Sequence, residues 1–198
     1  SLNTFMSVFD TKKNPAICVL PWVHEFKYFN GNTAPCCQGH ALRGNETLES
    51  IRQQMLKGDK PRVCGSCYLK EKDSNYSPRI QETIDWLKKF GEPNIKKPTL
   101  QYVDIRFDPT CNLKCKMCGP GSSTLWQKEK KVNIPLNDLN KEYLYSVDKK
   151  LLKKVYLAGG EPTFIKGYQL FLDELHQVNP DCEVIINTNL KKLPDSWK

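Results

Sequence analysis

The feature that most constrains this chain is a strand-like stretch that runs directly into three closely spaced cysteines. Residues 101–107 alternate apolar with polar side chains, which is the period of a β-strand. Asp108-Pro109 then interrupts the strand. Three cysteines follow with the spacing C-x3-C-x2-C, namely Cys111, Cys115 and Cys118. Since α/β folds with parallel strands place their chemistry at the carboxyl ends of the strands, this loop is the predicted functional site.

Three thiolates on one short loop suit an iron–sulfur cluster better than a single structural ion. A [4Fe–4S] cubane takes four ligands, so three cysteines leave one iron open to a substrate or cofactor. A structural zinc site normally fills all its positions from two separated cysteine pairs, and zinc is the alternative that we keep open. A disulfide framework is disfavoured because three is an odd number and the chain has no secretory pattern.

Two further strands are predicted after the loop. A short buried stretch at Val155–Ala158 leads into Gly159-Gly160-Glu161-Pro162, and residues 183–187 form the third strand. Glycines allow a ligand to approach the backbone closely, and exposed carbonyls together with Glu161 can accept hydrogen bonds from an ammonium group. The alternative is a plain Gly-Gly turn with Glu161 at a helix start. Helices are predicted over residues 122–131, 138–150 and 167–178.

At these residues the chain resembles the radical S-adenosylmethionine (radical SAM) superfamily. The three-cysteine loop and the later Gly159-Gly160-Glu161-Pro162 carry the resemblance. It implies a [4Fe–4S] cluster on Cys111, Cys115 and Cys118, whose open iron binds the amino and carboxylate groups of S-adenosylmethionine. It also implies an enzyme that takes one electron from a donor such as flavodoxin or ferredoxin. That electron cleaves S-adenosylmethionine to a 5′-deoxyadenosyl radical, which abstracts a hydrogen atom from the substrate.

The same resemblance assigns further contacts with S-adenosylmethionine. The Gly159, Gly160 and Glu161 turn is expected to bind the methionyl amino group. Met117 occupies a family position that is often aromatic, and it is expected either to pack on the adenine or to lie in the plain hydrophobic core. The polar residues that end the third strand, Asn187 and Asn189, are expected to face the cofactor.

A second cysteine-rich segment precedes the first strand. Cys18 is followed by a strand-like run over residues 23–29, and Asn30-Gly31 predicts a hairpin turn leading to Cys36 and Cys37. A helix is predicted over residues 45–57, with Asn45 as its N-cap, and Cys64-Gly-Ser-Cys67 follows it. Ligand chemistry alone allows either zinc or an iron–sulfur cluster at such a set of cysteines.

The spacing from Cys18 through Gly31 to Cys36 resembles the opening of SPASM and twitch segments in radical SAM proteins. The resemblance favours an auxiliary iron–sulfur cluster over zinc, held by Cys18, Cys36, Cys64 and Cys67. Cys37 can replace Cys36 or simply be packed. Such segments usually follow the barrel, whereas this one precedes it. Family members of this kind often modify peptides, so a peptide is one expected substrate.

The predicted fold class is α/β, a partial (β/α) radical SAM barrel of three β/α units preceded by a small cysteine-rich hairpin-plus-helix segment. The predicted parts are an N-terminal segment over residues 1–91, a linker over 92–99 and the front half of the barrel over 100–198. The N-terminal segment ends in a helix that begins after Ser77, with a predicted apolar face of Ile80, Ile84, Leu87 and Phe90. The family's barrel has more strands than these three, so we expect a longer enzyme and an unpaired sheet edge at residues 184–186.

Composition and charge limit the classes of protein to which this chain can belong. No apolar run approaches the length of a membrane span, and no signal peptide is apparent, so we expect a cytoplasmic protein without a membrane. The 198 residues carry a net charge of +8 spread along the chain, and no nucleic-acid motif accompanies it. Asp104 and Arg106 are expected to contact substrate in the barrel or to form a structural salt bridge. The alternative function is a non-catalytic zinc-binding module whose basic surface binds nucleic acid or protein.

Overall fold

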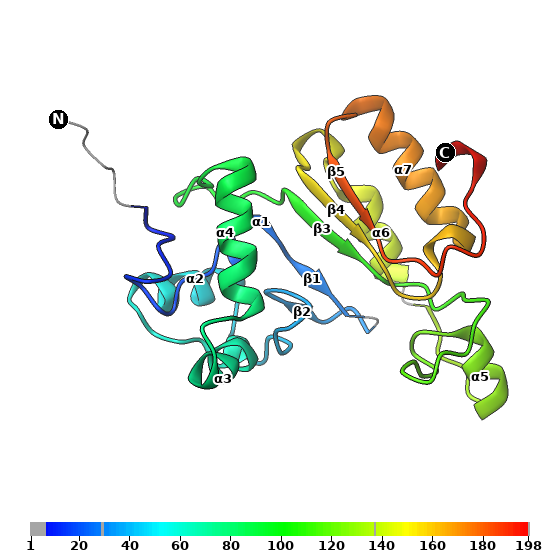
Figure 1. Ribbon diagram of the computed structural model, residues 1–198, viewed down its shortest axis with the longest axis horizontal. Helices are drawn as coiled ribbons and strands as arrows, with labels where there is room; N and C mark the ends of the chain where they lie inside the picture. The colour runs from blue at the N-terminus through cyan, green and yellow to red at the C-terminus, as the bar shows by residue number, and fades with distance from the viewer. Residues whose placement is uncertain (1–6, 29, 137, 198) are drawn as a thin grey trace. The chain divides into compact units, whose positions relative to one another are not determined.

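The computed structural model describes residues 7–28, 30–136 and 138–197, and the chain divides into two compact units (Figure 1). The first unit comprises residues 7–28 and 32–100, and the second comprises the remaining described residues. Residues 92–99, the predicted linker, group with the first unit, where Thr99 N–H donates to Trp22 O at 3.0 Å. Among the described residues, no helix combines the length and the apolar character needed to cross a membrane.

The first unit begins with a short helical turn and a small hairpin. Helix α1 spans Leu20–Val23, and strand β1 at Phe26–Lys27 pairs antiparallel with β2 at Thr33–Ala34. The predicted hairpin is present, but a strand over residues 23–29 is wrong at its start, because Val23 is helical. Pro21 stands in the first turn of α1, where its fixed φ favours a helix over a strand. Residue 29 of the predicted strand lies outside the described residues.

Three longer helices complete the first unit: α2 at Leu48–Leu56, α3 at Gly65–Asp73 and α4 at Pro78–Phe90. Helix α2 is capped by Thr47 rather than the predicted Asn45, because Thr47 and Ser50 form a reciprocal capping box. Helix α3, which was not predicted, continues the 3-10 turn η1 at Arg62–Cys64. Ser77 caps α4 as expected, since its hydroxyl accepts the Ile80 N–H at 3.3 Å.

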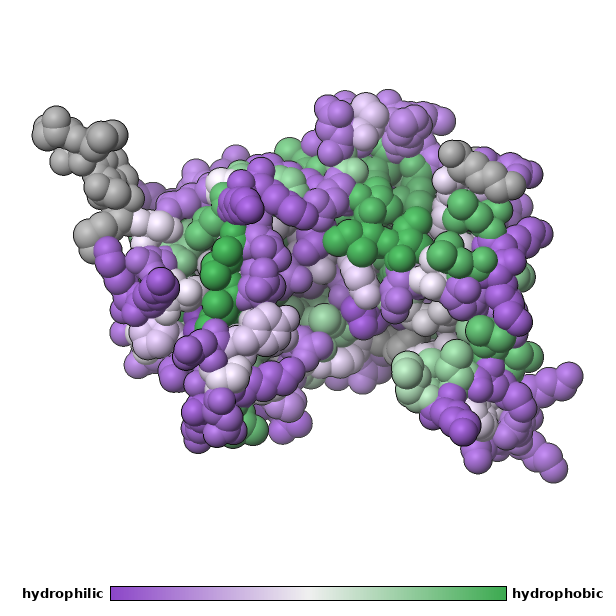
Figure 2. Space-filling model, in the orientation of Figure 1, coloured by the Kyte–Doolittle hydropathy of each residue, from purple (hydrophilic) through white to green (hydrophobic). Residues whose placement is uncertain are grey.

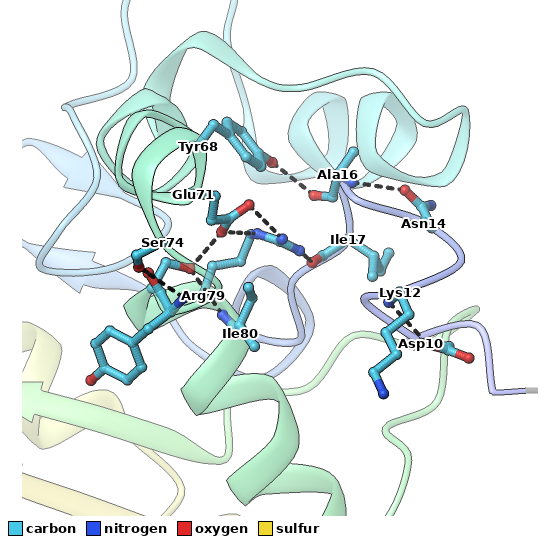
Figure 3. A network of polar contacts seen from close by, with 12 residues as sticks. Asp10, Lys12, Asn14, Ala16, Ile17, Tyr68, Glu71, Ser74, Arg79 and Ile80 are labelled. Carbon is cyan, nitrogen blue, oxygen red and sulfur yellow. Dashed lines mark hydrogen bonds and ion pairs between the residues drawn. The ribbon is translucent and has the colours of Figure 1, made fainter.

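The buried face of α4 differs from the predicted one. Arg79, Thr83 and Trp86 are buried, whereas Ile84 is 50% exposed. The predicted face was based on the apolar residues alone. A row of polar side chains can be buried instead when the surrounding unit supplies hydrogen-bond or ion-pair partners for them, as Figure 3 shows for Arg79. The helix therefore turns an arginine and a threonine toward the segment that carries Cys18.

The second unit is a mixed α/β fold around a small parallel sheet, consistent with part of a radical SAM fold. Its strands are β3 at Tyr102–Ile105, β4 at Lys154–Leu157 and β5 at Glu183–Ile186, in the order β3-β4-β5. The register pairs Ile105 with Leu157 and Leu157 with Ile186, so the three carboxyl ends lie at one edge of the sheet. In the part of the chain that the structure describes, β5 pairs only with β4.

Helices and short 3-10 turns connect the strands: α5 at Thr124–Lys130, α6 at Asp138–Ser146, η2 at Lys149–Leu151, η3 at Pro162–Phe164, α7 at Lys166–Val178 and η4 at Asp195–Trp197. The predicted helix over residues 138–150 ends at Ser146 instead, because Asp148 caps η2 by accepting the Lys150 N–H at 3.0 Å. The ring of Phe107 contacts that of Tyr143 in α6, and the Phe107 N–H donates to the Tyr168 hydroxyl of α7.

Candidate functional site

The cysteine loop leaves β3 and is anchored by the start of α5. Ser123 caps α5 by accepting the Trp126 N–H at 3.4 Å, and its hydroxyl donates to Leu113 O at 2.7 Å. The Trp126 indole N–H donates to Cys115 O at 3.0 Å. These contacts hold the loop at Leu113 and Cys115 against the start of α5. The cysteines therefore lie on an ordered turn.

The three loop cysteines lie close to one another. Cys115 is exposed, and Cys111 and Cys118 are half-buried. Burial first, and then the neighbouring Cys115 and Cys111, raise the pKa of Cys118. The Cys118 N–H also donates to Cys115 O at 3.0 Å, which closes a tight turn between them. Because the thiols oppose one another's ionisation, a bound cation would stabilise their thiolate forms.

The glycine turn after β4 packs directly on the base of this loop. The Gly160 N–H donates to Asp108 O at 3.0 Å, and the Glu161 N–H donates to Thr110 O at 2.7 Å. A Cβ at Gly160 would lie 2.1 Å from Thr110 O, and one at Gly159, where φ is +100°, would lie 3.0 Å from Arg106 Cα. The chain's own backbone therefore requires both glycines. Their predicted role toward a ligand stays a prediction.

Glu161 is buried, and its carboxylate joins the loops that follow β4 and β5. Oε1 accepts the Thr163 N–H at 3.2 Å and the Thr163 hydroxyl at 2.8 Å, and it also accepts the Thr188 hydroxyl. Oε2 accepts the Asn189 N–H at 2.8 Å. Burial opposes ionisation, but the hydrogen bonds from Asn189, Thr188 and Thr163 hold the pKa of Glu161 below its usual value. The carboxylate is thus an ionised structural bridge in this arrangement.

The third strand end reaches the cysteine loop as well. The Asn189 side-chain amide donates to Asn112 Oδ1 at 2.9 Å, beside Cys111. The Asn187 N–H donates to Leu157 O at 2.8 Å and continues the β4–β5 ladder by one bond. The loops after β3, β4 and β5 therefore meet at one edge of the sheet. The residues that join them are far apart in the sequence.

Two other predicted residues have defined surroundings. Met117 is 95% exposed, so the alternative that placed it in the hydrophobic core is wrong, because its loop position leaves nothing over the side chain. Asp104 and Arg106 form an ion pair in which Nε lies 2.7 Å from Oδ1. The guanidinium carbon also lies 5.5 Å from the centre of the Tyr156 ring. The structure thus contains the salt bridge, which was one of the two predictions for Asp104 and Arg106.

A pocket of about 620 Å³ lies among β3, α6 and α7 in the second unit. The residues that line it include three aromatic side chains, Phe107, Phe164 and Phe171, and two lysines, Lys141 and Lys166. It reaches the cysteine loop only at its base, through Asp108 and Thr110. The pocket is therefore separate from the thiols of Cys111, Cys115 and Cys118, which do not line it.

The cysteines of the first unit form a second, more buried set. Cys18 and Cys67 are buried, and Cys36 and Cys64 are half-buried. Burial is the main cause that raises the pKa of Cys18 to about 12 and holds the pKa of Cys36 well above its usual value. The charges of Cys67 on Cys18, and of Cys18 and Cys64 on Cys36, raise the pKa of these thiols further. Cys37 also acts on Cys36.

Two of these thiols also have neighbours that oppose the effect of burial. Leu20 and Thr83 lower the pKa of Cys18, and Gln38 lowers the pKa of Cys36, but burial remains the larger cause for both. Neighbours of this kind favour a thiolate over a thiol. Neither Thr83 nor Gln38 was singled out from the sequence. The signal that could have found Thr83 is its place four residues after Arg79, on one face of a helix beside the cysteines.

The fit of an iron–sulfur cluster rests on the chemistry of these donors. Within the residues that the structure describes, no group of three or more His, Cys, Asp or Glu side chains is arranged to hold a metal ion. Three thiols on one loop nevertheless suit a cluster with an open iron, and four thiols from separate segments suit a fully ligated one. Both cysteine sets therefore fit the group by ligand type and number.

Comparison with known proteins finds similarities in the second unit. Residues 105–197 match the model of the radical SAM superfamily. The chain is similar to the GTP 3′,8-cyclase of Helicobacter pylori strain 26695, with 28% identity over 102 residues, which cover 50% of this chain and 31% of that protein. It is also 28% identical over 104 residues to the GTP 3′,8-cyclase of Nautilia profundicola, covering 49% of this chain and 32% of that protein.

The chain thus spans about a third of the length of the curated relatives that it matches. No solved structure matches it. The family match begins within β3 and includes the cysteine loop, the glycine turn and β5, but not the first unit. The twitch-like interpretation of residues 18–67 therefore stays a prediction. Residues 105–197 are therefore similar to the radical SAM superfamily, and the relatives that share this part of the chain are enzymes by name.

Proposed function

We propose that this chain is a radical SAM enzyme in which Cys111, Cys115 and Cys118 hold a [4Fe–4S] cluster. One observation carries the proposal: the three-cysteine loop lies inside the family match and is hydrogen-bonded to the loops that follow β4 and β5. When bound, the cluster supplies the electron that cleaves S-adenosylmethionine to a 5′-deoxyadenosyl radical. The alternative, a non-catalytic zinc module, is disfavoured because the relatives are enzymes.

The chain's own residues would bind and orient S-adenosylmethionine beside this loop. We assign its methionyl amino group to the Gly159, Gly160 and Glu161 turn. The support is that this turn touches the base of the cysteine loop, so a ligand on the turn would lie near the thiols. Met117 has an exposed side chain available to the adenine. The polar residues Asn187 and Asn189 would face the cofactor from the end of β5.

We propose further that the first unit is a twitch- or SPASM-like segment whose cysteines hold an auxiliary iron–sulfur cluster. The ligands would be Cys18, Cys36, Cys64 and Cys67, with Cys37 as the substitute for Cys36. The support is the number of cysteines in the first unit and the way their charges raise one another's pKa. Zinc at this set is the competing occupant, and metal analysis separates the two.

The remaining parts of the proposal concern partners. The reductant would be a low-potential electron carrier such as flavodoxin or ferredoxin, in a cytoplasm that keeps thiols reduced. The name of the relatives directs the first substrate test to GTP. The resemblance of the first unit to SPASM and twitch segments directs the second test to peptides.

The ligand assignment is tested by changing one cysteine of each set in anaerobically reconstituted protein. Cys115→Ala should remove the loop cluster and leave the auxiliary iron, whereas Cys64→Ser should do the reverse. Cys182→Ala is the matched control, because Cys182 stands apart from both sets in the sequence and is half-buried. Iron content and EPR spectra report the two clusters separately. Full iron in the Cys115 variant would refute the loop assignment, and stoichiometric zinc lost with Cys64 would refute the auxiliary cluster.

A further inference from the structure

The pocket among β3, α6 and α7 has the size and the walls of a small-molecule site. Its volume of about 620 Å³ falls within the range of about 300–1,000 Å³ that is usual for ligand pockets. Phe107 and Phe171 line it and are buried, whereas two other lining residues, Phe164 and Leu170, are 41% and 50% exposed. Exposed apolar side chains beside a concave apolar pocket are typical of a surface that a ligand covers.

A buried hydroxyl lies at this pocket with its proton unused. Tyr168 is 3% exposed, and its hydroxyl oxygen accepts the Phe107 N–H at 2.9 Å and the Asp108 N–H at 3.1 Å. All three residues line the pocket. Burial is the main cause that raises the pKa of Tyr168, so the hydroxyl stays protonated at neutral pH. In the part of the chain that the structure describes, this hydroxyl donates to no acceptor, which is unfavourable for a buried donor until an acceptor reaches it.

The charged residues that line the pocket favour a ligand with a single negative charge. They are three lysines and two carboxylates, namely Lys141, Lys149, Lys166, Asp108 and Glu174. Lys149 Nζ lies 3.0 Å from Glu174 Oε2 and 5.1 Å from the centre of the Phe171 ring, so these two charges largely cancel. Lys166 is exposed and has no ion-pair partner among the described residues. Asp108 in turn opposes the approach of a multiply charged anion such as a phosphate.

We propose that this pocket binds a small monocarboxylic acid with an apolar body. The body packs against the phenylalanines, and the carboxylate accepts the Tyr168 hydroxyl proton in the field of Lys166. A hydrogen bond to an ionised acceptor is stronger than one between neutral groups, so the acid is favoured over a neutral molecule of the same shape. The inference goes beyond the proposed function and does not depend on it, because Cys111, Cys115 and Cys118 do not line the pocket.

The test is isothermal titration calorimetry of the full chain with 4-phenylbutyrate, beside the neutral 4-phenylbutanol, at neutral pH and constant ionic strength. We expect the acid to bind with a Kd of about 1 mM or lower, and the alcohol about tenfold more weakly. Tyr168→Phe should weaken binding of the acid about tenfold, because it removes the donor. Lys166→Gln should weaken the acid about threefold and leave the alcohol unchanged. Phe164→Ala should weaken both probes, since both lose an apolar contact.

Lys128→Gln is the matched control, because Lys128 is exposed on α5 and does not line the pocket. Should Tyr168→Phe fail to fold, as thermal unfolding would show, Lys166→Gln and Phe164→Ala carry the test. An acid that shows no binding at about 10 mM, or that binds no more tightly than the alcohol, overturns the proposal. Equal binding of the acid by the unmodified chain and by a folded Tyr168→Phe protein overturns it as well.

Discussion

At the scale of single residues, Glu161 shows how one buried carboxylate can organise a strand edge. Its position after a Gly-Gly pair predicts a polar group at the end of β4, and the structure places it there. The direction of its side chain was not predictable. It depends on hydrogen bonds to Thr188 and Asn189, which reach Glu161 only once β5 has paired with β4. The exposure of Met117 was not predictable either, because side chains in a loop do not alternate between buried and exposed positions in a regular pattern.

Replacement of Glu161 by Gln should lower the stability of the second unit at neutral pH by ~1.5–3 kcal/mol, the usual contribution of hydrogen bonds to a charged group. The pKa of Glu161 is lowered in the folded state. Its contribution is therefore complete above the unfolded pKa of ~4.3 and is lost as the pH falls through the lower folded value. The difference in Tm between the two proteins should shrink below that pH, as thermal unfolding across pH would show.

Glu129→Gln is the control for this experiment. Glu129 pairs with Lys114 on the exposed surface, where an ion pair contributes little to stability. A Tm difference for Glu161→Gln that stays constant from neutral to acidic pH would show that the carboxylate's charge is not the stabilising feature.

At the scale of elements, sequence patterns located most helices and strands but misjudged faces and ends. The three predicted strands overlap β3, β4 and β5, since each is a short apolar run followed by a loop. Helix α3 is not predicted, because the sequence analysis treats Cys64 and Cys67 as possible metal ligands and assigns no secondary structure to them. The face of α4 was misassigned because amphipathic periodicity identifies apolar stripes and gives no weight to a buried ion pair such as Arg79 with Glu71.

The contact between the glycine turn and the cysteine loop yields a prediction at this scale. Gly160→Ala would place a Cβ 2.1 Å from Thr110 O, so the turn and the loop must separate. Overpacking of this kind costs ~1–3 kcal/mol, and the displaced loop should bind less iron. Gly121→Ala in the same loop has no neighbour within 4 Å and should change neither property. Thermal unfolding and iron content measure both variants, and an unaltered Gly160→Ala protein would contradict the packing argument.

At the scale of the whole molecule, the sequence predicted an incomplete parallel sheet with an open edge. The described strands form a three-stranded parallel sheet in which β5 pairs only with β4, and Val184 is 38% and Ile185 is 37% exposed on β5. Figure 2 shows apolar surface gathered over the region of β5. What sequence reasoning could not supply is the meeting of three strand ends through Asn112, Glu161 and Asn189, because those contacts depend on the strand register.

An exposed apolar edge strand is a template for association with another chain. We therefore expect these 198 residues to self-associate through β5. Ile185→Lys should shift the protein toward monomer, because a charge on the edge strand opposes pairing. Leu69→Lys, at a position that is 62% exposed on α3, is the control and should leave the assembly unchanged. Sedimentation velocity measures both, and an unmodified chain that is monomeric at every concentration would refute the expectation.

The central claim is that the loop of Cys111, Cys115 and Cys118 supports reductive cleavage of S-adenosylmethionine. The most direct measurement is the formation of 5′-deoxyadenosine by anaerobically reconstituted protein supplied with a one-electron reductant. The account predicts that the unmodified chain and its Cys182→Ala variant form 5′-deoxyadenosine, and that Cys115→Ala forms none. Equal formation of 5′-deoxyadenosine by the Cys115→Ala protein would contradict the account.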